Sequence, residues 1–383
     1  YGCIDGTIFA DRTPQPELWQ VKRSHQPFQI EKKQPGKHIY QLKNLHHFTN
    51  LNEFDIQWDL MANGVIIETG MYNLNVPPRE AAEIDLNGEL AQLQPGVENI
   101  LTFQLLTKEN KLWAKKGFDI GFEQFELTSY SPESINKGNG TIQIIEKNKS
   151  IQITGEFFRY EFDSATGLIT SLKANDAEFL NEGPQLNVMR AATNNESAQF
   201  KNYIEKDWRR IGLDRLKHLL QGFNWYHLKD SVMVRSHFTS KAPGKEEYVD
   251  HSLTYIILNN GTLKIDHSVR PRGNFNIGWI PRIGLTLNIS EEFNKIKWYG
   301  RGPVENYPDR KTGSKIGIHS LQASDFYTPY VVPQDHGNRS DARWMEVTNG
   351  NTGWKIHSNG LFHFSVHRSE ERRVGKECAT GCR

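Results

Sequence analysis

The chain opens with YGCIDGTIFADRTPQPELWQVKRSHQPF, which runs from Tyr1 to Phe28. A short polar loop that ends at Gly6 leads into a segment with helix-start signals. Thr13 is a favourable N-cap, Pro14 fits the first helical turn, and Glu17 suits the positive end of the helix dipole. A loop that feeds a capped helix is how one unit of an α/β barrel ends, with chemistry carried on the loop. An ordinary helical hairpin at the start of a domain would give the same pattern.

Composition limits the class of protein. At 383 residues the chain is long enough for two or three domains. Its net charge is +1, from 46 basic and 45 acidic residues, which argues against nucleic-acid binding and against a role at an acidic membrane surface. No apolar run approaches the length of a membrane span. Three cysteines (Cys3, Cys378 and Cys382) give no disulfide framework, so the compartment cannot be read from them.

From Phe28 the apolar pattern changes from helical spacing to alternation. The clearest half-buried strand is 54–60, and Asn63-Gly64 after it is a strong hairpin signal. Strands at this spacing over about a hundred residues predict an immunoglobulin-like β-sandwich. We interpret His46 and His47 as a strand edge rather than a metal site, because no cysteine or carboxylate lies at a suitable offset. The other predicted strands are 28–31, 39–42, 65–68, 82–86, 100–106 and 120–127.

Residues 129–140 have the polar, Pro- and Gly-containing composition of a linker. A second all-β region is predicted to begin at Thr141. One helical insertion is expected from Tyr203 to Leu220, where apolar residues recur at helical spacing, although Gly212 weakens the pattern. Asn259-Asn260-Gly261 predicts a hairpin turn. The expected strands are 142–144, 151–153, 158–162, 168–172, 251–258, 263–269, 283–289, 296–299 and 362–368.

Six motifs stand out along the chain: GTIFADRTPQP (6–16), FDSATGLI (162–169), RAATNNE (190–196), PRIG (281–284), WYGRGPVENYPDR (298–310) and YTPYVVPQ (327–334). Together they resemble, in the expected order, landmarks of the large bacterial β-galactosidases of glycoside hydrolase family 2. The resemblance covers roughly residues 1–368. In the fifth motif, Gly300 and Gly302 allow a tight backbone path, and the charged residues Arg301, Glu305, Asp309 and Arg310 can pair within the loop.

The resemblance implies a mainly β chain made of three parts of that family's architecture. These are the end of a (β/α)8 barrel, an immunoglobulin-like β-sandwich, and a galactose-mutarotase-like β-supersandwich. The corresponding ranges are 1–27 for the barrel end, 28–128 for the sandwich, 129–140 for a linker and 141–368 for an incomplete supersandwich, the small-chain domain. The remainder, 369–383, is predicted to be a non-native tail, because the strand pattern stops and four Lys or Arg residues follow with Val374 as the lone large aliphatic residue.

The implied activity is hydrolysis of terminal non-reducing β-D-galactose residues, as in lactose, with retention. Such enzymes need two carboxyl groups about 5 Å apart. In the family both are glutamates on barrel strands that would precede Tyr1, so the chain on its own is expected to be inactive. Neither Glu17 nor Glu305 matches those motifs. Relatives that act on β-glucuronides or β-mannosides share the barrel and rank second.

One active-site position carries over from the resemblance. The family places an asparagine before the glycine of the last barrel loop, where it contacts galactose and a sodium ion; here that position is Asp5, before Gly6. Aspartate keeps an oxygen donor for a hard cation but loses the amide donor and adds a charge. An Asx turn is the alternative. The family also implies a divalent cation, magnesium or calcium, bound mostly outside this chain, a β-galactoside substrate, and a full-length enzyme that can form a homo-oligomer.

A different class of function also fits the residue types. The supersandwich fold occurs in aldose mutarotases, which transfer protons with His and Glu, and His319, His336 and Glu305 could supply these groups. A sugar-binding module is a further alternative. Fold similarity is weak support for either, because function lives in the site. The pair Cys378 and Cys382 has neither the C-x-x-C spacing nor a nearby histidine of a metal or redox site.

Overall fold

The computed structural model describes residues 6–136, 138–197 and 204–368. These residues are mainly β, as predicted, and the paired strands of every sheet run antiparallel. The described residues contain two α-helices, α1 (Glu17–Ser24) and α2 (Ile204–Ile211). They also contain three short 3-10 helices, η1 (Leu51–Glu53), η2 (Leu213–Arg215) and η3 (Ala323–Phe326).

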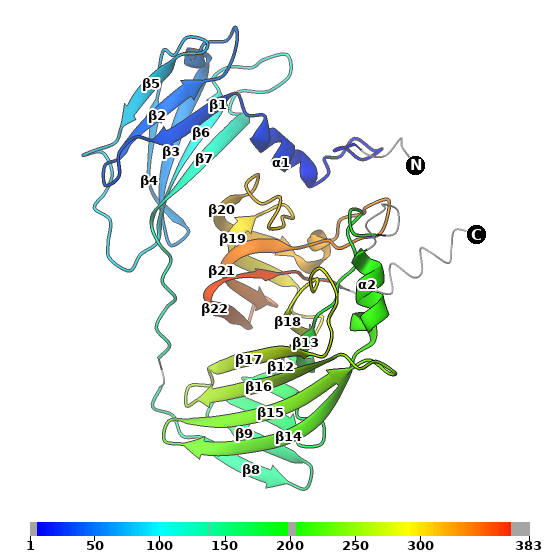
Figure 1. The fold of residues 1–383 in the computed structure, drawn as a ribbon. Helices are drawn as coiled ribbons and strands as arrows, with labels where there is room; N and C mark the ends of the chain where they lie inside the picture. Colours follow the sequence, from blue (N-terminus) through cyan, green and yellow to red (C-terminus); the bar gives the residue numbers. More distant parts are fainter. Residues whose placement is uncertain (1–5, 137, 198–203, 369–383) are drawn as a thin grey trace.

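The first sandwich consists of two sheets that pack face to face after α1 (Figure 1). Their strand orders are β1-β2-β5 and β4-β3-β6-β7. Alternating residues of both sheets, among them Tyr40, Leu60 and Phe103, fill one apolar core. The strands are β1 (Phe28–Lys32), β2 (Ile39–Asn44), β3 (Phe54–Ala62), β4 (Val65–Tyr72), β5 (Ala81–Asp85), β6 (Asn99–Thr107) and β7 (Asp119–Thr128).

The predicted Asn63-Gly64 hairpin joins β3 to β4. Both residues have positive φ, 46° and 88°, as a type I′ turn requires. A Cβ atom added at Gly64 would lie 2.7 Å from the Ile318 side chain, so the turn packs directly on the C-terminal half of the chain. Glycine is therefore required here for its conformation and for the space.

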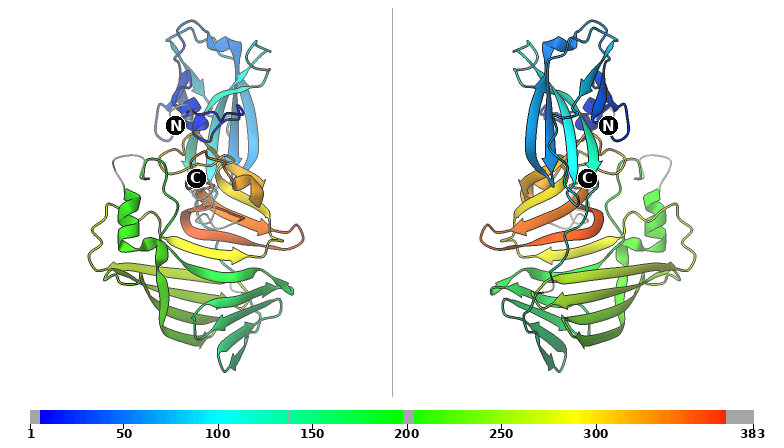
Figure 2. Two further views of the ribbon diagram at one scale, coloured as in Figure 1. Left: turned by 90° about the vertical axis from the view of Figure 1, so that its right-hand side faces the viewer. Right: turned by 90° about the vertical axis from the view of Figure 1, so that its left-hand side faces the viewer.

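Four further sheets form the C-terminal half (Figures 1 and 2). Their orders are β12-β11-β10-β9-β8, β13-β18, β14-β15-β16-β17 and β20-β19-β21-β22. The first strands are β8 (Gln143–Lys147), β9 (Ser150–Thr154), β10 (Phe158–Asp163), β11 (Ile169–Ala174), β12 (Ala177–Glu178), β13 (Leu180–Asn187), β14 (Lys217–Leu228) and β15 (Ser231–Lys241). The others are β16 (Tyr248–Leu258), β17 (Leu263–Arg272), β18 (Gly284–Ile289), β19 (Lys295–Gly302), β20 (Lys315–Gln322), β21 (Arg339–Thr348) and β22 (Gly353–Phe364).

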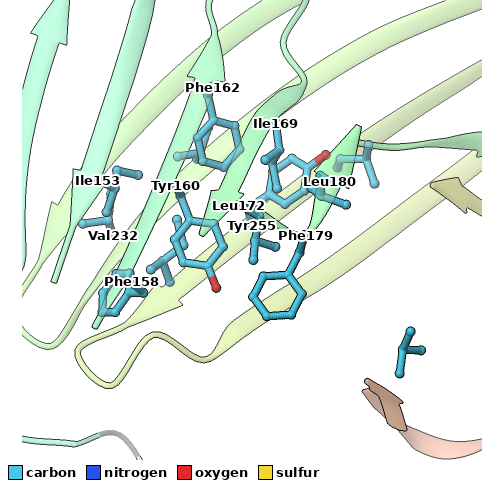
Figure 3. Close-up of a cluster of buried hydrophobic side chains, with 14 of the residues drawn as sticks. Ile153, Phe158, Tyr160, Phe162, Ile169, Leu172, Phe179, Leu180, Val232 and Tyr255 are labelled. Atoms are coloured by element: carbon cyan, nitrogen blue, oxygen red, sulfur yellow. The ribbon is translucent and has the colours of Figure 1, made fainter. Parts of the chain in front are cut away.

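A single large core joins these sheets (Figure 3). Phe158, Tyr160 and Phe162 alternate along β10 and point toward the facing sheet. There they pack in one core with Val232 and Tyr255. The rings of Phe162 and Tyr255 meet edge to face, with centroids 5.2 Å apart. The period-two pattern of the sequence thus places every second side chain of β10 in the core.

A buried ion pair joins the two halves of the chain. Glu98, just before β6, accepts hydrogen bonds from the Arg343 guanidinium of β21, including one from Nε at 3.0 Å. The hydroxyl of Tyr299 in β19 donates to Glu98 Oε2 at 2.5 Å. Glu98 and Arg343 are 0% and 1% exposed, so the pair is shielded from water. An apolar cluster lies alongside, formed by Met61, Ile100, Tyr299, Ile316, Ile318 and Trp344.

The segment predicted as a linker runs along one side of the molecule, from β7 to β8 (Figure 1). Tyr130 donates to the Arg343 carbonyl at 3.3 Å, and Glu133 pairs with Lys355 at 3.3 Å. The Asn260 amide donates to the Asn136 carbonyl at 2.8 Å. These contacts attach residues 129–136 to strands β21 and β22 and to the turn between β16 and β17.

The predicted helix from Tyr203 to Leu220 is wrong over its second half. Tyr203 lies outside the described residues, α2 ends at Ile211, and Gly212 adopts φ 85°, which stops the helix. After the η2 turn, β14 begins at Lys217. Leu219 and Leu220, the last residues of the apolar stripe, therefore belong to a strand. Pairing of eleven residues of β14 with β15 overrides the local helical pattern.

A row of polar side chains crosses the sheet β14-β15-β16-β17. His218 Nδ1 lies 2.6 Å from Ser240 Oγ, which lies 2.8 Å from His251 Nε2. His251 Nδ1 lies 3.2 Å from His267 Nε2. Burial, together with the neighbouring histidines, lowers the pKa of His251 to about 3, and burial lowers that of His267 to about 4. Both rings are therefore neutral in the folded chain near neutral pH.

Among the described helices, none is long and apolar enough to cross a membrane.

We expect Glu98→Gln to lower the free energy of unfolding by about 3–5 kcal/mol, because it leaves Arg343 charged and buried without its carboxylate. Urea unfolding followed by tryptophan fluorescence measures the change. The matched control is Glu83→Gln, which breaks the exposed Lys33–Glu83 pair and should cost less than about 1 kcal/mol. Equal small losses in the two variants would contradict this assignment.

We expect the chain to lose stability as the pH falls below about 6.5 toward 4. The folded-state pKa values of His251 and His267 lie below the ordinary value of 6.5, so the unfolded chain binds more protons in this range. His251 alone should account for about 2 kcal/mol between pH 7 and pH 5. Urea midpoints measured across this range should fall less steeply in His251→Gln, while the exposed His227→Gln should follow the parent chain. Three identical slopes would argue against the assignment.

Candidate functional site

Residues 6–16, which follow Asp5, form a short hairpin held by backbone hydrogen bonds. Asp5 lies outside the described residues, and the structure begins at Gly6. The amide of Phe9 donates to the Thr13 carbonyl at 2.9 Å, and the amide of Gln15 donates to the Thr7 carbonyl at 2.9 Å. We call residues 6–16 the opening hairpin.

The predicted helix cap at Thr13 is wrong. Thr13 donates from its amide and its hydroxyl to Asp11 Oδ1, at 2.9 and 2.7 Å. This local turn takes the place of the cap, and α1 begins only at Glu17, after Pro16. Glu17 does lie in the first turn, as predicted from the helix dipole.

Glu305 is the centre of the motif loop 302–310. Its side chain is 2% exposed, and both carboxylate oxygens are bonded. Oε1 accepts from Arg310 at 2.5 Å, and Oε2 accepts from the Thr328 hydroxyl at 3.0 Å and the Gly337 amide at 2.6 Å. The predicted pairing within the loop is therefore observed for Glu305 and Arg310. It is wrong for Arg301, whose Nε donates to Asp341 of β21 at 2.6 Å.

The opening hairpin and α1 dock on this loop. The Tyr330 hydroxyl lies 2.6 Å from Glu305 Oε1 and 2.9 Å from Glu17 Oε1. Arg310 Nη2 is 3.5 Å from the same Glu17 oxygen. The ring of Phe9 approaches that of Tyr330, with centroids 6.4 Å apart. Burial and the neighbouring carboxylates raise the pKa of Tyr330 above its ordinary value, so the hydroxyl keeps its proton.

A second contact holds α1 farther along its length. Gln20 donates to the Thr312 hydroxyl at 2.9 Å and accepts from the Gly313 amide at 2.9 Å. On the other side, Arg23 forms a bidentate pair with Glu123 of β7, at 2.9 and 2.5 Å. The helix thus bridges the first sandwich and the motif loops.

Other motifs meet in the same region. Asp335 accepts from Arg282 of the PRIG motif at 2.8 Å, and it lies 3.9 Å from Arg190 of the RAATNNE motif. Arg190 also pairs with Glu196 of its own motif, at 2.6 Å. The Asn194 amide donates to Gln334 Oε1 at 3.0 Å. Asp335 thus accepts a charge-assisted hydrogen bond from the PRIG motif, and a neutral hydrogen bond joins Asn194 to Gln334, 140 residues away.

The arrangement is suited to holding loops in place rather than to proton transfer. Glu305 already accepts hydrogen bonds on both oxygens and is buried, so it has no exposed oxygen to offer a substrate. The three residues considered for a mutarotase have separate surroundings. His319 stacks near Trp298 and lies 3.3 Å from the Lys315 carbonyl, whereas His336 meets the rings of Tyr327 and His367.

A buried cation completes the cluster. Arg339 is 2% exposed, lies over the Phe326 ring at 4.5 Å, and donates to the Gly337 carbonyl at 3.1 Å. Burial lowers its pKa to about 10, so it is still charged at neutral pH and offsets the negative charge of Glu305.

Metal ligands do not converge in the described part of the chain, where no group of three or more His, Cys, Asp or Glu side chains could hold an ion. The expected sodium ligand, Asp5, is outside that part. Sequence reasoning did not single out Tyr330 or Gln20, because their roles depend on partners about three hundred residues away. No local signal marks such contacts.

Comparison with known proteins identifies two matching family models. The model described as "Beta galactosidase small chain" matches residues 154–377, which reaches into the tail that the sequence predicts to be non-native. The model described as "Beta-galactosidase, domain 4" matches residues 40–128, the first sandwich.

Curated relatives agree with these models. The chain is 31% identical to a β-galactosidase of Priestia megaterium, over 91% of this chain and 33% of that protein. It is 27% identical to a β-galactosidase of Pseudoalteromonas haloplanktis, over 91% of this chain and 35% of that protein. A β-galactosidase of Lactobacillus delbrueckii subsp. bulgaricus is 29% identical over 94% of this chain and 34% of that protein. The chain thus spans about a third of the length of these relatives. Because the small-chain model matches more than half of its residues, the chain belongs to the β-galactosidase small chain family.

Proposed function

We propose that this chain is the C-terminal portion of a retaining β-galactosidase. The observation that carries the proposal is the docking of the opening hairpin and α1 on the motif loops. Phe9 of the GTIFADRTPQP motif contacts Tyr330 of the YTPYVVPQ motif, so residues that carry the resemblance meet in the folded chain. The relatives named above, all β-galactosidases, support the same reaction class.

The proposed reaction is hydrolysis of terminal non-reducing β-D-galactose residues, such as those of lactose, by double displacement. One carboxyl group would act as acid and base, and a second, about 5 Å away, as nucleophile. In the described residues Glu17 and Glu305 both contact Tyr330 and Arg310, and Glu305 is closed to solvent. We therefore assign both catalytic carboxylates to residues upstream of Tyr1.

The proposed architecture follows from the same reasoning. Residues 1–27 would be the end of the catalytic (β/α)8 barrel, and 28–128 an immunoglobulin-like spacer. Residues 141–368 would be the supersandwich, which docks the barrel end through its motif loops. In this arrangement the C-terminal half acts on the catalytic site through contacts rather than through chemistry of its own.

Asp5 is the residue that we place in the active site. It precedes Gly6 at the start of the opening hairpin, and its carboxylate is a hard oxygen donor that suits a sodium ion near the galactose. The resemblance implies that sodium and any divalent cation are held mainly by the part of the enzyme outside this chain. The carboxylate of Asp5 would add one oxygen and one negative charge.

No specific observation favours a mutarotase or a free-standing sugar-binding module, since Glu305 is buried and accepts four hydrogen bonds.

The isolated chain should not hydrolyse a chromogenic β-galactoside such as a nitrophenyl β-galactoside, because it lacks the pair of carboxyl groups. The measurement is release of the chromophore by the purified chain, compared with the longer protein that includes the upstream residues. Hydrolysis is expected only for the longer protein. Turnover by the chain alone, or none by the longer protein, would overturn the proposal.

In the longer protein, Asp5→Ala should raise the sodium concentration for half-maximal activity and the Michaelis constant, each by about tenfold, because one oxygen ligand and its charge are lost. Asp11→Ala is the matched control, since it removes a nearby exposed carboxylate that bonds only within the hairpin turn. If both variants keep the sodium dependence and Michaelis constant of the parent, Asp5 forms an Asx turn and not a ligand.

A further inference from the structure

We propose that an apolar patch shared by α1 and the first sandwich is the surface on which the upstream part of the barrel docks, with Trp113 as its anchor. The patch consists of the exposed side chains of Trp19, Leu112, Trp113 and Phe118, and we call it the Trp113 patch. The inference rests on the proposed function, because its occupant consists of residues that would precede Tyr1.

The loop between β6 and β7 holds its tip in a fixed conformation. The amide of Lys111 donates to the Ala114 carbonyl at 2.8 Å, which closes the turn at the tip. At the base of the loop, the Thr107 hydroxyl donates to the Lys115 carbonyl at 2.6 Å and accepts from the Phe118 amide at 2.9 Å. The two residues inside the turn are therefore ordered before a partner arrives, which lowers the entropy cost of binding.

These two residues are apolar and project into solvent. Leu112 is fully exposed, and Trp113 is 64% exposed. The rings of Trp113 and Phe118 meet edge to face, with centroids 6.0 Å apart. An indole that is held in place yet left in water is typical of a protein interface, where a tryptophan often contributes much of the binding energy.

The patch continues from this loop onto α1, which lies beside the start of β7 (Figure 1). Lys22 connects the two elements. Its ammonium lies 4.8 Å from the centroid of the Phe118 ring and 5.8 Å from that of the Trp19 ring. It also donates to the Asp119 carbonyl at the first residue of β7. One surface therefore spans the proposed barrel end and the first sandwich.

α1 lacks the packing that a helix of eight residues needs. Within the part of the chain that the structure describes, α1 buries none of its residues, although Leu18, Trp19 and Val21 are apolar. Short helices are marginal in water and owe their stability to packing of an apolar face. A further body of protein is therefore needed on the side of α1 that Gln20 and Arg23 leave open.

In the proposed enzyme that body is the upstream part of the barrel, because α1 ends the barrel. This chain spans about a third of the length of the relatives named above, so the enzyme has ample chain to supply it. Since Lys22 and Phe118 connect Trp19 to the loop tip, a body packed on α1 would also cover Trp113.

The rim of the patch predicts the chemistry of the docked surface. Lys115 and Lys116 are exposed beside the tip, and Lys22 lies within the patch. An apolar recess for Trp113 with acidic residues at its edge would complement these charges. The competing occupants are a second copy of this chain and a sugar stacked on the Trp113 ring.

Hydroxyl-radical footprinting read by mass spectrometry compares side-chain exposure in this chain and in the longer protein. Oxidation of Trp113 should be about fivefold slower in the longer protein, because docking removes the indole from water. Phe157 is the matched control, since it is also 64% exposed and lies far along the chain, in the turn before β10. Its oxidation should be equal in the two proteins, and equal oxidation of Trp113 would overturn the proposal.

Trp113→Ala tests whether the contact stabilises the enzyme. In this chain the substitution should leave the urea midpoint unchanged, because the side chain is exposed. In the longer protein it should make thermal unfolding about tenfold faster, as for the loss of an interface anchor. Phe157→Ala should leave that rate unchanged. An equal loss of stability in this chain and in the longer protein would mean that Trp113 stabilises its own loop, and would overturn the proposal.

The same footprint distinguishes the occupants. If oxidation of Trp113 in this chain falls as the chain concentration rises, a second copy covers the patch, and if it falls on addition of lactose, a sugar does. Either result overturns docking of the barrel. A longer protein that protects Trp113 but does not hydrolyse β-galactosides would refute the proposed function and support the docking surface.

Discussion

The arrangement of the chain depends on the buried pair between Glu98 and Arg343. Two charges that are removed from water stabilise a structure only when their geometry and hydrogen bonds are complete, and here Tyr299 supplies the additional donor. The pair fixes the first sandwich against sheet β20-β19-β21-β22. α1 is attached to β7 of that sandwich through Arg23 and to the loop at 312–313 through Gln20, so the position of the sandwich also affects how α1 docks.

Dense clusters of charge are often functional sites, but the cluster around Glu305 has the properties of a structural one. A catalytic carboxylate needs an exposed oxygen near a substrate, whereas Glu305 is surrounded by donors from two loops, 303–314 and 327–338. The charge of Arg339 is likewise occupied by contacts within the protein, since it lies over the Phe326 ring and beside the Gly337 carbonyl. The distinctive residues of the longest motif therefore hold loops together. A motif can identify a family through residues that never contact the substrate.

The sequence predicts the strands well where a local rule decides them. Alternation along β3 and β10 and the Asn63-Gly64 turn are examples, because period two and positive φ are properties of a few neighbouring residues. The prediction fails where another partner competes for a residue. Thr13 bonds Asp11 instead of capping the helix, and pairing with β15 places Leu219 and Leu220 in a strand. The candidate site could not be predicted at all beyond its motifs, since Glu17 and Tyr330 are 313 residues apart.

If residues 1–27 end a catalytic barrel, as proposed, the contact between Glu17 and Tyr330 gives the C-terminal half a role in holding that end. A loop that ends a barrel is free on one side, and its conformational entropy must be reduced if it is to present a ligand in one position. Gln20 and Arg23 can hold a helix, but they lie beyond the first turn and cannot restrain the loop before it. The contact at the start of α1 lies next to that loop, and the ring of Phe9 adds a contact from the loop itself. A hydroxyl between two carboxylates, oriented by one arginine, provides that contact from a scaffold whose own position is set by the Glu98–Arg343 pair.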